Sequence, residues 1–201
     1  MDFVIFNYRW HYRMRRKRRF HLTYCVLIVF LCLASCDPAD RNISDTEKKE
    51  VVYRMYAGYK KDFPEVRDIS PQQAMELLDQ EKVVFVDTRM PSEMAVSMIP
   101  GAVTKQDLLS HTDRYKDITI IGYCTISYRS GVFARDLAKD EITVLNLQAG
   151  ILAWILEGGK VYDKSGKEVK RVHVYGDKWD YVPAGYEAVK FSLWERVINS
   201  K

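Results

Sequence analysis

Three short apolar runs rich in β-branched residues recur along the middle of the chain. They are Val83–Val86, Ile118–Ile121 and Ile142–Leu145. Continuous runs of this kind suit strands that are buried on both faces of a parallel sheet. Stretches with helical periodicity lie between and after them, and they predict helices over 92–97, 106–112, 130–139 and 150–157. This alternation predicts an α/β fold in which crossover helices connect parallel strands.

The segments on either side carry patterns of their own. Ser70 followed by Pro71 is typical of a helix start, with Ser as the N-cap and Pro at the first helical position. Apolar residues spaced by three and four predict an amphipathic helix over 46–60. Beyond residue 160, the polar turn 163–167 predicts a hairpin, and the apolar spacing of 187–198 predicts a final helix. Because residues 161–201 hold too many aromatic side chains for a solvated tail, we expect them to pack on the domain. The alternative is that they form a surface for a partner or a membrane.

A basic cluster and a short apolar run stand near the start of the chain. Residues Arg15–Arg19 are all basic, and the 13 residues Leu22–Ala34 carry no charge. That run is too short to span a bilayer, which needs about 20 residues. A basic segment before a short apolar one is typical of a signal peptide. We therefore expect residues 1–35 to be an export signal, and Met14, directly before the cluster, to be the translation start.

The end of the apolar run resembles a lipoprotein processing site. Leu33-Ala34-Ser35-Cys36 is similar to the lipobox of bacterial lipoproteins, in which a small residue precedes a cysteine. The resemblance implies that Cys36 is acylated through its sulfur and becomes the mature N-terminus. The acyl chains would hold the protein at a membrane surface without spanning it. We expect a lipid-anchored protein of the bacterial cell envelope that faces the periplasm or the exterior, on either membrane.

The net charge of +4 is concentrated in this leader. Residues 1–35 hold seven basic residues and one acid, whereas the rest of the chain holds 24 basic and 26 acidic residues and has a net charge of −2. A broad basic surface for nucleic acid is therefore not supported.

The cysteines and histidines exclude two further classes. Cys25, Cys32 and Cys36 lie in or next to the leader, so Cys124 is alone in the body and no disulfide framework can form there. The body keeps only His111 and His173, and we expect no metal site and no cofactor.

Cys124 stands where a nucleophile would be activated. The apolar run from Ile118 continues to Tyr123 and leads directly into Cys124, just before the predicted helix 130–139. Ligands bind at the carboxyl ends of strands in open α/β sheets. Unpaired amides and the positive end of a helix dipole favour a thiolate, and Arg129 adds a positive charge on the same loop. The loop is suited to activate a cysteine and to hold an anion; a buried, inert cysteine is the alternative.

Three motifs occur along the chain in the order in which one known family has them. The first signature of the rhodanese domain matches Asp87-Thr88-Arg89, Glu93 and Ile99–Ala102. Its active loop matches Cys124–Arg129 with Ser130, and its third signature matches Gln148–Trp154. The chain therefore resembles a rhodanese-like sulfurtransferase fold, a parallel sheet flanked by helices, with short extensions at both ends. We expect four segments: signal peptide 1–35, tether and helical extension 36–69, rhodanese domain 70–160, and an aromatic extension of hairpin plus helix 161–201.

The resemblance implies persulfide chemistry. Cys124 would be the catalytic nucleophile, taking sulfur from a small anionic donor such as thiosulfate and passing it to a thiol or cyanide. The donor and the terminal sulfur would be held by Thr125, Ile126, Ser127, Tyr128, Arg129 and Ser130, among which Ser130 is better suited to cap the helix. Asp87, Arg89 and Glu93 would form a structural charge set, with Arg89 and Glu93 four positions apart and able to pair.

Departures from the motifs keep a second class of function open. The loop glycine of the family is Ser127 here, the histidine before Ile-Pro is Met98, and the first glycine of the third signature is Ala149. A left-handed conformation at a residue other than glycine costs about 1–2 kcal/mol. The alternative to a sulfurtransferase is a non-catalytic binding module of rhodanese fold. A phosphatase or arsenate reductase is less favoured, because those relatives have five residues between cysteine and arginine and residues 125–128 are four.

Overall fold

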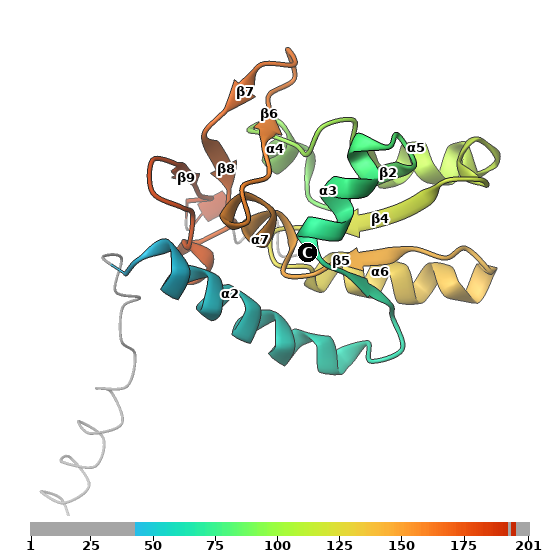
Figure 1. The fold of residues 1–201 in the computed structure, drawn as a ribbon, viewed down its shortest axis with the longest axis horizontal. Coiled ribbons are helices and arrows are strands. Elements are labelled where there is room, and N and C mark those ends of the chain that lie inside the picture. Colours follow the sequence, from blue (N-terminus) through green and yellow to red (C-terminus); the bar gives the residue numbers. More distant parts are fainter. Residues whose placement is uncertain (1–42, 193, 196–201) are drawn as a thin grey trace, which may run out of the picture. The chain divides into compact units, whose positions relative to one another are not determined.

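A five-stranded parallel sheet forms the centre of the protein (Figure 1). The structure, a computed structural model, describes residues 43–192, 194 and 195. The strands lie in the order β1-β5-β4-β2-β3, and every neighbouring pair is parallel. Their bounds are β1 Asp68–Ile69, β2 Val83–Asp87, β3 Val103–Thr104, β4 Thr119–Tyr123 and β5 Leu145–Leu147. The α/β fold with a parallel sheet, predicted from the alternation, is confirmed.

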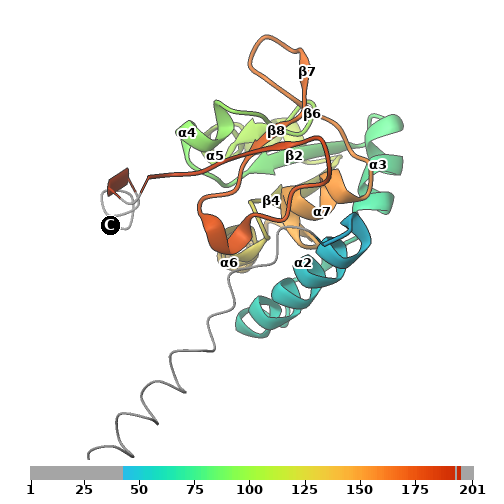
Figure 2. The same ribbon diagram turned by 90° about the vertical axis from the view of Figure 1, so that its left-hand side faces the viewer.

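Helices cover both faces of this sheet. Figures 1 and 2 show α3 (Pro71–Asp79) and α7 (Gly150–Leu156) on one face, and α5 (Lys105–Ser110) and α6 (Tyr128–Leu137) on the other. The Ser70 hydroxyl accepts a hydrogen bond from the Gln73 amide and caps α3, as predicted. Other helical elements are α4 Pro91–Met94 and the 3-10 turns η1 Lys60–Asp62, η2 Thr112–Tyr115, η3 Ala138–Asp140 and η4 Asp177–Trp179.

Two core elements differ from the predicted ranges. The strand predicted over 142–145 runs over Leu145–Leu147. The Ile142 amide donates to the Leu137 carbonyl (3.1 Å) and closes the end of α6, with Glu141 in a left-handed turn (φ 60°), so the strand begins later. The helix predicted over 92–97 ends at Met94, because Met98 forms a β-bridge with Tyr162 and the chain must straighten before it.

The helix before the sheet, α2 (Asp45–Tyr59), belongs to the same hydrophobic core. Its side chains Val52 and Tyr56 are buried among the core residues. The helix contacts α7, and Lys49 forms an ion pair with Glu157, just after α7 (2.9 Å). The N-terminal extension therefore packs on the sheet domain.

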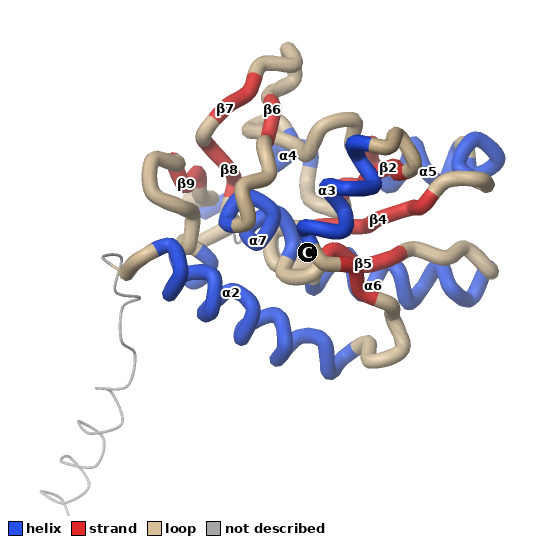
Figure 3. Tube along the Cα trace, viewed as in Figure 1, coloured by secondary structure: helices blue, strands red, loops and turns tan. Residues whose placement is uncertain are grey.

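The C-terminal segment also packs on the domain. The strands β6 (Val161–Tyr162) and β7 (Glu168–Val169) form the hairpin, and β8 (Arg171–His173) pairs in parallel with β9 (Glu187–Val189) (Figure 3). Val172, Val174 and Phe191 are buried. The final helix predicted over 187–198 is wrong at its start, because residues 187–189 are extended. Pairing with β8 satisfies their backbone groups, as the Glu187 amide donates to Lys170 (2.8 Å) and the Val174 amide to Val189 (2.9 Å).

Within the described ranges, no helix is both long enough and apolar enough to cross a membrane. The predicted signal peptide, acylation at Cys36 and start at Met14 concern residues outside those ranges.

Candidate active site

The end of β4 places Cys124 in the wall of a cavity. Cys124 follows Tyr123, the last residue of the strand, and is a free cysteine with 2% of its surface exposed. The cavity has a volume of about 930 Å³, and Thr88 after β2 and Thr104 at the end of β3 also line it. It therefore lies at the carboxyl ends of three parallel strands, where ligands bind in open α/β sheets.

The loop after Cys124 carries a row of free backbone donors. The six amides of residues 125–130 have no hydrogen-bond partner among the described residues. The last of them belong to the first turn of α6, whose amides have no intrahelical acceptor. Together with the positive end of the helix dipole, these donors form a site for an anion directly after the cysteine.

Ser127 adopts a strained backbone conformation in this loop. Its φ of 62° is left-handed, which costs a residue with a Cβ about 1–2 kcal/mol. Two hydrogen bonds hold it there: its hydroxyl donates to the Leu147 carbonyl, and its own carbonyl accepts from the Asn146 side-chain amide (3.1 Å). The loop thus keeps its turn without the glycine of the family motif.

The start of α7 holds the other side of the loop. The amides of Ile151 and Leu152 donate to the carbonyls of Cys124 (2.9 Å) and Thr125 (3.3 Å). Gly150, which lies between Ala149 and Ile151, has a φ of 63°. A Cβ at this position would lie 2.4 Å from the backbone oxygen of Cys124. Only glycine allows the two backbones to approach this closely.

Arg129 and Glu93 form a two-pronged ion pair beside Cys124. The guanidinium donates from Nη1 to Oε2 (2.7 Å) and from Nη2 to Oε1 (2.8 Å) of a carboxylate that is fully buried. Burial opposes ionisation of Glu93, but the hydrogen bonds and charge of Arg129 outweigh it and lower the pKa of the carboxyl. Burial also opposes the charge on Arg129, whereas Glu93 and a Cys124 thiolate raise its pKa. The pair therefore holds a positive group close to the cysteine sulfur.

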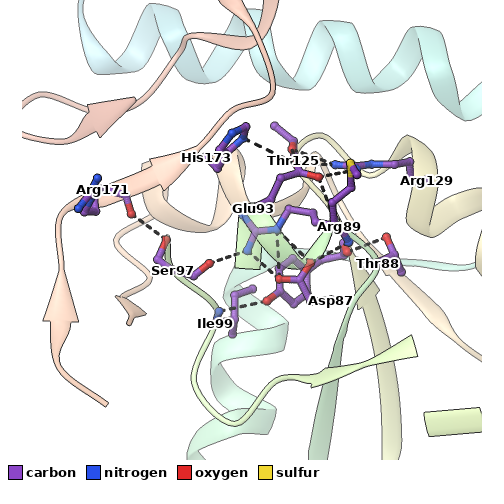
Figure 4. A network of polar contacts seen from close by, with 12 residues as sticks. Asp87, Thr88, Arg89, Glu93, Ser97, Ile99, Thr125, Arg129, Arg171 and His173 are labelled. Atoms are coloured by element: carbon purple, nitrogen blue, oxygen red, sulfur yellow. Dashed lines mark hydrogen bonds and ion pairs between the residues drawn. The ribbon is translucent and has the colours of Figure 1, made fainter. Parts of the chain in front are cut away.

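The charged residues predicted from the first signature, Asp87, Arg89 and Glu93, form other pairs than the predicted one. Arg89 donates to the carboxylate of Asp87 (2.7 to 3.1 Å) and to the Ser97 carbonyl (2.6 Å), and both charged side chains are fully buried (Figure 4). The suggested Arg89–Glu93 pair is wrong, because α4 begins only at Pro91, so the two residues do not share a helix. Ser97 in turn donates to the Arg171 carbonyl (2.7 Å), which joins this set to β8.

The six residues predicted to hold substrate fall into two groups. Thr125, Ile126, Tyr128 and Arg129 line the cavity. The side chains of Ser127 and Ser130 are buried and do not line it. Ser130 lies inside α6 and donates to Asn146 (2.7 Å), whereas the N-cap position is Ser127, so the predicted cap at Ser130 is wrong.

Several residues of the site carry no signal in the motifs. His173 lies 4.0 Å from Glu93 and contacts Phe191 with the rings tilted by 53° and their centres 4.1 Å apart. Burial lowers the pKa of its imidazole, and its Nδ1 accepts from the Tyr175 amide (3.0 Å). Tyr59 of α2 and Tyr175 and Trp179 of the C-terminal segment line the cavity. The aromatic richness of the C-terminal extension pointed only to Tyr175 and Trp179.

Comparisons with known proteins agree with this geometry. The sequence profile of the Rhodanese-like domain family matches residues 70–157. A sulfurtransferase of Allochromatium vinosum is 36% identical over 89 residues, which cover 41% of this chain and 80% of that protein. The chain belongs to the rhodanese family.

Solved structures resemble this rhodanese domain as well. A rhodanese-related protein of Thermoplasma volcanium is 21% identical, with a TM-score of 0.42 over 47% of this chain and 96% of its own. Thiosulfate sulfurtransferase of Pseudomonas aeruginosa is 20% identical, with a TM-score of 0.46 over 62% of this chain and 24% of its own.

Replacing Arg129 by Ala should destabilise the rhodanese domain as well as weaken donor binding. Removing one partner of a buried pair costs about 3–5 kcal/mol, and less here, since 33% of the Arg129 side chain is exposed. Thermal melting should therefore show a clear loss, and the KM for thiosulfate should rise in the folded fraction. Arg135→Ala, which removes an arginine of the same helix paired with exposed Asp136, is the control and should change little.

A double-mutant cycle separates the two roles of Arg129. Adding Glu93→Gln to Arg129→Ala removes the stranded buried charge and should restore part of the lost stability without restoring KM. If Arg129→Ala melts like the wild type, the ion pair does not support the fold.

Proposed function

We propose that this protein is a sulfurtransferase that carries sulfur as a persulfide on Cys124. The observation that carries the proposal is the row of six unpartnered amides directly after the cysteine. An anionic terminal sulfur needs such donors, as an oxyanion does in acyl transfer. The relative from Allochromatium vinosum, named a sulfurtransferase, supports the same class of reaction.

The first half-reaction loads the cysteine. The Cys124 thiolate attacks the outer sulfur of thiosulfate, an S–S bond forms to Cys124, and the S–S bond of thiosulfate breaks. Sulfite leaves with the electron pair, and Cys124 becomes a persulfide anion, Cys–S–S⁻. Within the described chain, no carboxylate side chain lines the cavity, whereas Arg129 and Lys105 do, which favours an anionic donor.

The second half-reaction transfers the terminal sulfur from Cys124 to an acceptor. A thiolate acceptor attacks the terminal sulfur, takes it as R–S–S⁻, and restores the Cys124 thiolate; cyanide would leave as thiocyanate in the same way. The unpartnered amides of 125–130 stabilise the terminal sulfur between the two steps. Arg129, held in place by Glu93, orients the donor by its fixed fork of N–H groups.

Intact-mass measurement after incubation with thiosulfate tests this function against a binding module of the same fold. We expect one added sulfur atom on the wild-type protein, removed again by a thiol. The Cys124→Ser variant should gain no mass under the same conditions. If the wild-type protein takes up no sulfur from any sulfane donor, the non-catalytic binding module takes the place of this proposal.

We further propose that the protein is anchored to the bacterial cell envelope by lipid on Cys36. The basic cluster Arg15–Arg19, the short apolar run and Leu33–Cys36 support this placement. Replacing Cys36 by Ala should release the protein from the membrane fraction. Unchanged membrane association of that variant would contradict the lipid anchor.

A further inference from the structure

The cavity in front of Cys124 is larger than a small inorganic donor requires. Its volume of about 930 Å³ lies in the range of about 300–1,000 Å³ that is typical of sites for small organic ligands. Thiosulfate would contact only the cysteine end of such a space.

Part of the cavity wall is apolar and aromatic. Its large side chains are Tyr59, Met90, Met94, Tyr128, Tyr175 and Trp179. They make contacts that shape this wall: Tyr59 packs edge-on against Tyr128 (5.4 Å between ring centres), and Tyr175 against Trp179 (5.6 Å). Flat ligands of apolar character pack well against such rings.

Much of this wall comes from outside the segment that matches the family. Tyr59 lies before residue 70, and Lys164, Tyr175 and Trp179 lie after residue 157. The two extensions, which pack on the sheet domain, therefore supply surface that the rhodanese segment alone does not have. A specificity built on these residues is a property of this chain.

Positive charge accompanies the apolar wall. Lys105 and Lys164 line the cavity, and neither forms an ion pair with another described residue. Two ammonium groups in the lining favour a ligand that carries negative charge.

We propose that the donor used at this site is an anionic organic sulfane-sulfur compound with an aromatic or similarly bulky apolar body, selected over thiosulfate by the Tyr59–Tyr175–Trp179 wall. The inference rests on the proposed sulfurtransferase function and specifies its substrate class. For an aryl thiosulfonate, Ar–SO₂–S⁻, the Cys124 thiolate takes the outer sulfur, the S–S bond breaks, and the arenesulfinate leaves with the electron pair. Charge balances as it does with thiosulfate.

Binding to the Cys124→Ser protein tests this selection without sulfur transfer. Titration calorimetry compares benzenethiosulfonate with thiosulfate, and benzenethiosulfonate should bind at least tenfold more tightly. In the Cys124→Ser background, Trp179→Ala should reduce that preference at least fivefold. Trp194→Ala is the matched control, since Trp194 is 73% exposed and does not line the cavity, and it should leave the preference unchanged. Melting curves show that each variant is folded, and Trp179→Phe, which keeps a ring, should lie between the wild type and Trp179→Ala.

The outcomes separate this inference from the function on which it rests. Equal affinity for the two donors, or no binding of benzenethiosulfonate at millimolar concentration, overturns the inference even if thiosulfate loads Cys124. A preference that a folded Trp179→Ala variant retains in full also overturns it. Selective binding without any persulfide on the wild-type protein would instead contradict the sulfurtransferase, while the aromatic selection would stand.

Discussion

Cys124→Ser is expected to give a folded protein with no detectable sulfur transfer. Serine is close to cysteine in size, and Cys124 is packed against a loop held by Ile151 and Leu152, so the substitution should cost little stability. Its hydroxyl remains protonated at neutral pH and cannot form a persulfide. Cys124 is the only cysteine that follows Cys36 in the sequence, so no other thiol of the body can take over the sulfur. Thiocyanate formation from thiosulfate and cyanide measures the loss directly.

Cys124→Ala provides the companion measurement. It removes the hydroxyl as well as the thiol, so it should be as inactive as Cys124→Ser while melting at a similar temperature. Turnover by a folded Cys124→Ser protein above the rate of Cys124→Ala and of a blank would contradict the role of Cys124 as the sulfur carrier.

Gly150→Ala is expected to have the largest effect on stability of any single methyl addition in the site. The new Cβ would lie 2.4 Å from the Cys124 oxygen and 2.8 Å from the Thr125 oxygen, both of them backbone atoms. Overpacking of this kind costs about 1–3 kcal/mol, and the left-handed φ of 63° adds about 1–2 kcal/mol. Each kcal/mol lowers the melting temperature by about 2–4 °C in a protein of this size. Because the displaced carbonyls belong to the active loop, the rate of sulfur transfer should fall too.

Gly101→Ala isolates the contribution of the clash. Gly101 has a similar φ of 68°, but nothing lies within 4 Å of its Cβ position. It should show the cost of the left-handed conformation and no more, with sulfur transfer near the wild-type rate. Equal losses of stability in the two variants would mean that α7 shifts freely and does not hold the loop.

The predictions from sequence failed where several contacts compete for one residue. Their spacing of four positions predicted an ion pair between Arg89 and Glu93. In the structure, Arg89 pairs with Asp87, and Glu93 pairs with the distant Arg129. The apolar residues of 187–198 have helical spacing, but Glu187–Val189 form a strand because their backbone pairs with β8. In both cases the local signal was real, and a partner far along the chain satisfied the same groups better.

The sequence alone determined the alternation of the three central strands with helices, the position of Cys124 at the end of β4 and the rhodanese family, because buried β-branched runs, caps and motifs are local features of the chain. The two-residue strands β1 and β3 were not predicted, because each is too short to show a pattern of its own. The left-handed turn at position 127 was likewise suspected from a missing glycine and is present. Only the tertiary structure decided that Glu93 supports Arg129 across 36 positions, and that Tyr59, Tyr175 and Trp179 meet in one cavity wall. Such contacts depend on how α2 and the C-terminal strands pack on the sheet, and side-chain periodicity along one element carries no information about its neighbours in space.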